Sequence, residues 1–131
     1  GNPIIEAASL GALATLAAED GRFAEAFASI REHLPIACGL GDVEKATALM
    51  RVAWVLLPAG RANDAARVLA TADAMFEEMG FADTFWAVAK TRKLEAALRH
   101  ALDATGFEAA WEDGRFRTPD EAVALAFDAL A

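Results

Sequence analysis

The sequence has few of the residues that disulfides and metal sites require. Its 131 residues include one cysteine, Cys38, and two histidines, His33 and His100. A lone cysteine cannot form an internal disulfide, and secreted proteins rarely keep a free thiol, so we expect a reducing, cytoplasmic environment. The histidines fall on different predicted helices, whereas zinc sites need three or four converging ligands. We therefore predict no metal-binding residues.

Candidate nucleophiles are equally few. Cys38 ends a predicted helix, where the negative end of the helix dipole raises a thiol pKa. Ser9 and Ser29 lie inside predicted helices and lack the Gly-x-Ser-x-Gly turn that exposes a catalytic serine. The stretch 39–42 has two glycines, but no strand precedes it and the third glycine of a dinucleotide-binding loop is missing. The sequence predicts no catalytic residue, no cofactor-binding residue and no cofactor.

Long apolar runs and massed positive charge are also absent. The longest apolar runs are short, such as Val52 to Ala59, and a transmembrane helix needs about 18 residues or more. The net charge is −8 and the 12 lysines and arginines are scattered, which disfavours a surface that neutralises phosphates. We expect neither a membrane span nor direct nucleic-acid binding.

The composition strongly favours helix. Alanine is abundant and tyrosine is absent, so nearly every window prefers helix to strand. Apolar residues recur at helical spacing in two stripes. The first stripe is Phe23, Ala26, Phe27, Ile30 and Leu34, and the second is Ala65, Leu69, Ala72, Phe76 and Met79. The fold class is predicted to be all-α.

Caps and glycines divide the chain into seven predicted helices. Starts are indicated by Asn2-Pro3, by Asp42, and by Thr118-Pro119 with Glu121 completing a capping box. Stops are indicated by Gly21, Gly39, Gly60, Gly80 and Asp113-Gly114. The expected helices are 3–19, 22–38, 42–59, 61–79, 82–104, 106–113 and 119–130. Pro35 lies inside the second, so we expect a kink or an early end there.

The glycines also indicate an internal repeat. Gly21 and Gly60 are 39 residues apart, as are Gly41 and Gly80. The segments 19–30 and 58–69 align without a gap, pairing Gly21 with Gly60, Ala26 with Ala65 and Ile30 with Leu69. Two copies of a helix-turn-helix unit are therefore predicted.

This unit resembles a tetratricopeptide-type repeat. Leu13 and Val52 stand on the first helix, and Ala26 and Ala65 on the second, where a small residue lets two helices pack closely. Both alanines should therefore be buried. The period departs from the usual value of about 34, and His33 takes a small-residue position. The resemblance implies an antiparallel helix-hairpin solenoid.

We expect a single helical-repeat domain over residues 1–131. Its repeat hairpins are predicted at about 3–38 and 42–79, followed by a long helix and a cap at about 82–131. The chain begins with glycine and not methionine, so we expect it to be a piece of a larger protein.

The last third of the chain resembles the end of the helical-repeat region in large bacterial regulators, which pair a signal-transduction ATPase with a LuxR-type or similar output domain. The matching residues are Phe107, Ala110, Trp111, Gly114, Arg115, Thr118, Glu121 and Ala122. The chain has no Walker motif and no DNA-reading helix-turn-helix, so the resemblance carries neither activity. It implies a capping helix from Pro119 that closes the solenoid, with Phe107, Trp111 and Phe127 covering the last exposed helix face and Trp111 largely buried.

The resemblance implies a non-enzymatic protein-interaction or signal-sensing module of a bacterial transcriptional regulator. Its partners would be a protein, a peptide or other domains of the parent chain. One alternative is a solenoid that binds a small-molecule inducer in an apolar pocket with a few converging polar groups. A less favoured alternative is a helical enzyme whose titratable residues converge from different helices.

Two sets of residues are candidates for binding. Arg51 and Trp54 lie on a predicted first helix and could form a groove for an acidic or amphipathic peptide. Trp54 and Trp86 either pack between repeats or anchor a ligand. The second set is the one concentration of positive charge, which is either a docking patch for an acidic partner or a solvated helix face. It comprises Lys90, Arg92, Lys93 and Arg99.

Overall fold

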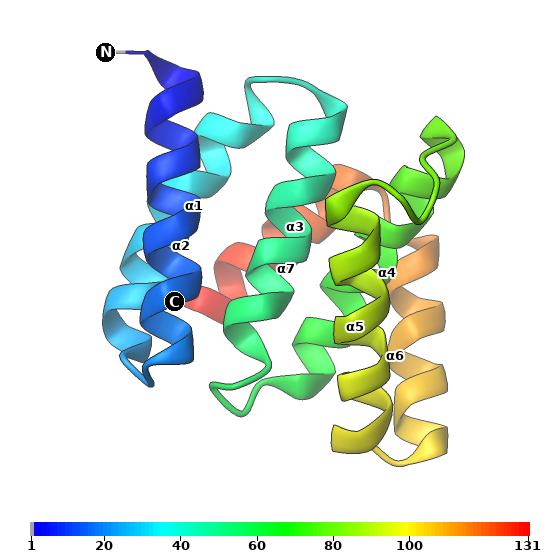
Figure 1. The fold of residues 1–131 in the computed structure, drawn as a ribbon. Helices are drawn as coiled ribbons and strands as arrows, with labels where there is room; N and C mark the ends of the chain where they lie inside the picture. The colour runs from blue at the N-terminus through cyan, green and yellow to red at the C-terminus, as the bar shows by residue number, and fades with distance from the viewer. Residues whose placement is uncertain (1) are drawn as a thin grey trace.

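The structure is a computed structural model that describes residues 2–131. Its helices are α1 (Pro3–Glu19), α2 (Phe23–Cys38), α3 (Asp42–Leu56), α4 (Ala62–Met79), α5 (Trp86–Ala101), α6 (Ala104–Phe116) and α7 (Pro119–Leu130). Residues 2–131 contain no strand, which confirms the predicted all-α class. Figure 1 shows the helices side by side, with α7 behind α3.

The predicted starts of the first and last helices are confirmed. The Asn2 side chain accepts a hydrogen bond from the Ile4 amide at 2.9 Å, with proline in the first turn. The Thr118 hydroxyl accepts from the Glu121 amide at 3.1 Å, and the Glu121 carboxylate accepts from the Thr118 amide at 2.9 Å. These reciprocal bonds are the predicted capping box.

The two aligned turns have the same backbone geometry. Gly21 and Gly60 have φ values of 77° and 83°, in the left-handed region that favours glycine. In both turns the amide of the next arginine donates to the carbonyl five residues earlier, at 2.8 Å and 3.0 Å. Ala26 and Ala65 are fully buried, as predicted.

The first helices of the two units differ more than the alignment suggests. Val52 is buried, whereas Leu13 is 56% exposed. The reason is position: α1 packs mainly on α2 and α3, while α3 also contacts α4, α5 and α7. The same sequence position therefore faces solvent in α1 and the core in α3. Assignment to the tetratricopeptide type stays a prediction.

Several predicted boundaries are wrong. The helix expected at 82–104 is α5, which is shorter at both ends. Its C-terminal end comes early because Asp103 caps the next helix by accepting from the Gly106 amide at 2.6 Å. The cap of α3 is Gly41, and Asp42 is its first helical residue. The helix α2 does not end early at Pro35 but continues to Cys38.

Gly114 is expected from the sequence to stop a helix, but it lies inside α6. A Cβ added at this position would come within 2.0 Å of the Arg67 carbonyl oxygen on α4. The Gly114 carbonyl also accepts a hydrogen bond from the Thr71 hydroxyl at 2.5 Å. This glycine therefore allows α4 and α6 to pack backbone against backbone.

That the last helix caps a solenoid stays a prediction. This helix packs against α2, α3 and α4, and Figure 1 shows it crossing behind α3. Arg61 donates to the Ala129 carbonyl at 2.9 Å, and Arg31 donates to the Leu130 carbonyl. These cations stabilise the carbonyl end of α7.

The three aromatic residues predicted to form the cap have different environments. Phe107 is buried and stacks on Trp111 with ring centroids 5.3 Å apart. Trp111 and Phe127 are only partly buried against the core. Trp111 is therefore not exposed, which agrees with the prediction of a largely buried indole, while Phe107 is more completely buried.

Candidate functional site

The structure separates the two residues of the predicted groove. Arg51 and Trp54 both lie on α3, but each pairs with a residue of α5 instead of with each other. The Arg51 guanidinium carbon lies 5.2 Å from the centroid of the Trp86 ring. The Lys90 Nζ atom lies 3.7 Å from the centroid of the Trp54 ring. The face between α3 and α5 thus carries two cation–π pairs.

The predicted basic residues on α5 are engaged in different ways. Lys90 covers Trp54, and burial there lowers its pKa. Arg92 and Arg99 both donate to the Glu95 carboxylate, at 2.7 Å and 3.2 Å. Lys93 is exposed. Because two of the four cations have carboxylate partners, much of the local positive charge is balanced, and a docking role stays a prediction.

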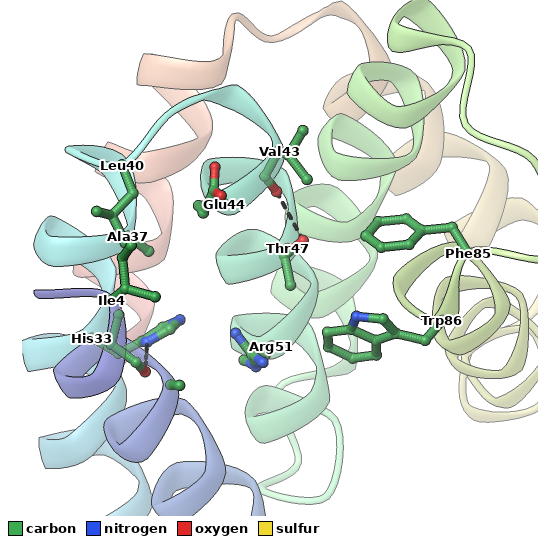
Figure 2. A pocket seen from close by; sticks show the side chains of 12 residues that line it. Ile4, His33, Ala37, Leu40, Val43, Glu44, Thr47, Arg51, Phe85 and Trp86 are labelled. Atoms are coloured by element: carbon green, nitrogen blue, oxygen red, sulfur yellow. Dashed lines mark hydrogen bonds between the residues drawn. The ribbon is translucent and has the colours of Figure 1, made fainter.

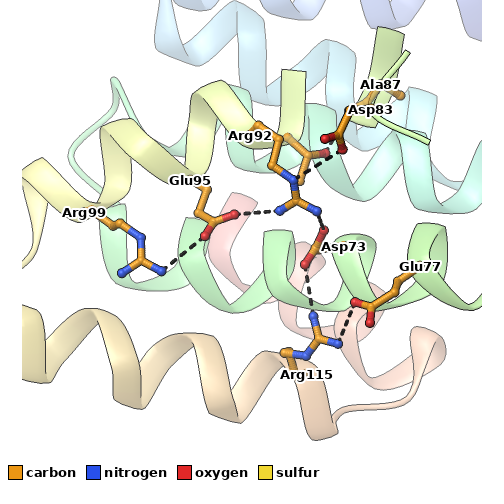
Figure 3. A network of polar contacts seen from close by, with 9 residues as sticks. Asp73, Glu77, Asp83, Ala87, Arg92, Glu95, Arg99 and Arg115 are labelled. Carbon is orange, nitrogen blue, oxygen red and sulfur yellow. Dashed lines mark hydrogen bonds and ion pairs between the residues drawn. The ribbon is translucent and has the colours of Figure 1, made fainter. Parts of the chain in front are cut away.

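A buried carboxylate organises the polar contacts of α4, α5 and α6. The Asp73 side chain on α4 is 6% exposed and accepts from Arg92 on α5 at 2.6 Å and from Arg115 on α6 at 3.0 Å. Arg115 also pairs with Glu77 at 3.0 Å. Figure 3 shows the two guanidiniums meeting the Asp73 carboxylate from opposite sides. We call Asp73, Arg92 and Arg115 the Asp73 cluster; every charge in it has a partner.

A pocket of about 300 Å³ lies between α1, α2, α3 and the start of α5. Its walls are mostly apolar. They include Ile4, Ala37, Leu40, Val43, Phe85 and Trp86. The polar side chains His33 and Arg51 also line it, and Figure 2 shows Arg51 between His33 on one side and Trp86 on the other. We call this the α1–α3 pocket.

His33 is a buried histidine with one free nitrogen. The residue is 1% exposed, and its Nδ1 lies 2.8 Å from the Ala7 carbonyl oxygen. A carbonyl can only accept, so Nδ1 carries the proton and donates. The Nε2 atom is buried and has no hydrogen-bond partner. Burial, with a smaller contribution from the Arg51 charge, lowers the pKa of His33, so the ring is neutral near pH 7.

Arg51 reaches the pocket across a glycine. A Cβ at Gly11 would lie 3.1 Å from the Arg51 Cδ and Nε atoms and 3.1 Å from the His33 Cε1 atom, so both side chains converge where α1 lacks a side chain. Within residues 2–131 no carboxylate forms an ion pair with Arg51. Burial lowers the pKa of its guanidinium, which still stays charged.

The acidic residue at the pocket rim does not neutralise Arg51. Glu44 lines the pocket on α3, two turns before Arg51. Its Oε2 atom lies 3.2 Å from the point that a Cβ at Gly41 would occupy, so the carboxylate turns toward the positive N-terminus of α3. The cation at the base of the pocket is left without an anion.

Sequence reasoning identifies Arg51 but misses its companions. From the sequence, His33 is interpreted as a buried or solvated residue, and Gly11 is not a candidate site residue. One signal is present, because a glycine in the middle of an alanine-rich helix lowers helix stability and usually has a packing reason. The partners of that glycine come from other helices, so the sequence does not identify them.

Other chemistry finds little support in residues 2–131. No group of three or more histidine, cysteine, aspartate or glutamate side chains is arranged to hold a metal ion there. Burial raises the pKa of the Cys38 thiol, which disfavours the reactive thiolate. None of the helices in this part of the chain combines the length and apolar character that a membrane span needs.

Comparisons of the chain with models of protein families, with curated proteins and with solved structures find no match. The α1–α3 pocket is therefore interpreted from its own geometry.

Proposed function

We propose that this chain is a non-enzymatic sensor domain that binds a small apolar molecule in the α1–α3 pocket. The observation that carries the proposal is a mostly apolar pocket in which His33 Nε2 has no hydrogen-bond partner and the Arg51 guanidinium has no ion-pair partner within the described residues. Ligand sites typically combine apolar walls with a few placed polar groups and begin at about 300 Å³. Among the functions considered from sequence, this favours the small-molecule sensor.

The pocket is placed where a ligand could transmit a signal. Its walls come from the first helix pair, from α3 and from the start of α5, so an occupant touches several helices at once. A ligand that binds one arrangement of these helices better than another shifts the population toward it. A role in a bacterial regulator, proposed from the sequence resemblance, would use such a shift to control a neighbouring domain.

The test is titration of the isotopically labelled protein with octanol, a neutral apolar probe, followed by NMR. Of the three tryptophans, Trp86 lines the pocket and Trp111 lies on α6. We expect the Trp86 indole signal to shift and the Trp111 signal to stay unchanged. Shifts spread over the whole surface would contradict a defined pocket.

A blocking variant sharpens this test. Ala8 lines the pocket yet is exposed, so Ala8→Phe should fill the pocket without disturbing the core. Ala12 is an exposed residue of the same helix outside the pocket lining, so Ala12→Phe is the matched control. Octanol binding should disappear in the first variant and persist in the second. Equal octanol binding by the two variants would contradict the proposed site.

A protein-docking function is the second candidate, and a separate observation favours it. The outer face of α1 exposes large apolar side chains, with Ile5 63% exposed and Leu13 and Leu16 each 56% exposed. Apolar side chains gathered on one surface often mark a protein contact. Replacing Leu13 and Leu16 together by serine should then weaken regulation in the parent protein without changing octanol binding. Unaltered regulation by the folded variant would argue against docking there.

A further inference from the structure

We infer that the ligand of the α1–α3 pocket is a hydroxy acid with an apolar tail, which places its carboxylate on Arg51 and donates a hydrogen bond from its hydroxyl to His33 Nε2. The inference rests on the proposed function and names the ligand class. It follows from the hydrogen-bonding character of the two polar groups in the pocket.

Arg51 selects for a negatively charged acceptor. A guanidinium has five N–H donors and no acceptor, and it suits a planar carboxylate. The Trp86 ring, whose centroid lies 5.2 Å from the Arg51 guanidinium carbon, offers no carboxylate or carbonyl acceptor to these donors. No ion pair occupies them in the described chain. A half-buried cation in this situation gains most from an anion that the chain does not supply.

His33 selects for a donor. Its Nδ1 proton is used by the Ala7 carbonyl at 2.8 Å, so Nε2 of the neutral ring offers only a lone pair. A second proton on the ring would place two buried cations side by side, because Arg51 approaches the same point above Gly11. A buried acceptor without a partner is costly. The occupant should therefore offer a hydroxyl or amine hydrogen here.

The two requirements combine in one small head group. Figure 2 shows the His33 ring directed toward Arg51. An acceptor anion and a donor must thus lie within one head group, as they do when a hydroxyl is next to a carboxylate. Most of the other lining residues, such as Leu40, Val43 and Phe85, are apolar and suit a hydrocarbon tail.

An ordered water is the main rival occupant. A water molecule could accept from Arg51 and donate to His33 Nε2, because buried waters commonly bridge such groups. Water alone would make the pocket indifferent to the head group of an apolar ligand. The experiment therefore compares ligands that share a tail and differ in the head.

The probes are α-hydroxyoctanoate, octanoate and octanol, titrated into the full chain near neutral pH with the Trp86 indole signal as readout. We expect octanoate to bind about tenfold or more tighter than octanol, since a hydrogen bond to a charged group contributes this much. The α-hydroxyl should add about threefold to tenfold. These comparisons use the unaltered protein and need no variant to fold.

Variants then assign each preference to a residue. Arg51→Met keeps the length of the side chain and removes the charge, so the advantage of octanoate over octanol should disappear. Arg99→Met removes an exposed charge far from the pocket lining and should preserve that advantage. His33→Asn keeps an N–H where Nδ1 stands and lacks Nε2, so it should abolish only the advantage of α-hydroxyoctanoate over octanoate.

The outcomes separate this inference from the proposed function. If none of the three probes shifts the Trp86 signal, the proposed function fails and the inference fails with it. If octanol binds and the acids bind no tighter, the pocket stands and the hydroxy-acid inference is overturned. The inference is also overturned if octanoate binds tighter than octanol by the same factor in the wild type and in Arg51→Met. It is overturned as well if α-hydroxyoctanoate binds no tighter than octanoate.

Discussion

Two regions of this molecule place arginine side chains against partly buried polar groups, and they differ in whether the charges are matched. In the Asp73 cluster, two arginines from different helices share one buried carboxylate at 2.6 Å and 3.0 Å. In the α1–α3 pocket, Arg51 faces a neutral histidine and an aromatic ring instead. Matched charges fix helices to one another, whereas an unmatched cation beside an open space is available to a ligand.

A glycine within a helix lies next to each of these regions, and the two glycines have different roles. Gly114 admits the backbone of α4, with the Arg67 carbonyl 2.0 Å from the position of a Cβ. Gly11 admits only side-chain atoms of Arg51 and His33, each 3.1 Å from that position. Backbone cannot move aside without shifting a helix, while a long side chain can. The first glycine is therefore structural, and the second shapes the pocket.

The largest expected effect is the difference between alanine substitutions at these glycines. Gly114→Ala should lower the free energy of unfolding by about 3 kcal/mol or more, because α4 and α6 must separate. Gly11→Ala should change it by less than about 1 kcal/mol, since a better helix residue offsets a small shift of Arg51. Urea denaturation of both variants measures this. Similar losses in the two would show that the pocket is packed as rigidly as the α4–α6 contact.

The next effect compares loss of a matched charge with loss of an unmatched one. Asp73→Ala leaves two arginines without their shared partner and should cost about 2 kcal/mol, less than a fully buried pair because Arg92 and Arg115 are 45% and 36% exposed and can hydrate. Arg51→Met leaves no carboxylate without a partner, so its free energy of unfolding should stay within about 1 kcal/mol of the wild-type value. Thermal and urea unfolding check both. A larger loss for Arg51→Met would mean that its charge is structural.

Local features of the fold could be predicted from sequence, because neighbouring residues determine them. The capping box at Thr118 and Glu121 and the left-handed turns at Gly21 and Gly60 involve residues at most five positions apart. The prediction for Gly114 is wrong because glycine serves equally at helix ends and at close helix contacts. Only the packing of α6 on α4 decides between these uses, and the sequence alone does not determine that packing.

The candidate site is harder to predict for the same reason. Gly11, His33, Arg51 and Trp86 come from four helices, and no local sequence pattern links them. Arg51 is a candidate from sequence, but the aromatic predicted to accompany it is Trp54 and not Trp86. Arg51 and Trp54 are three residues apart on α3, which suggests a pair. The approach of α5 instead places Trp86 against Arg51 and Lys90 against Trp54.

The smallest effect concerns pH, and it tests whether the pocket differs from the Asp73 cluster in its protonation. The pKa of His33 in the folded protein lies below its ordinary value of 6.5, chiefly because of burial. Between the two values the unfolded chain binds more protons, so the free energy of unfolding falls as pH is lowered through this interval. Carboxylate and guanidinium groups as classes ordinarily titrate outside it. This fall in the free energy of unfolding should therefore be absent from His33→Asn, whose side chain keeps a donor to the Ala7 carbonyl and cannot titrate.

The measurement is the urea midpoint of both proteins from about pH 8 to about pH 5. The difference between the two midpoints reports His33, because the other titrating groups are the same in both. A difference that stays constant over this range would mean that His33 is not held neutral by its surroundings, and Nε2 would then lose its assigned role as an acceptor in the pocket.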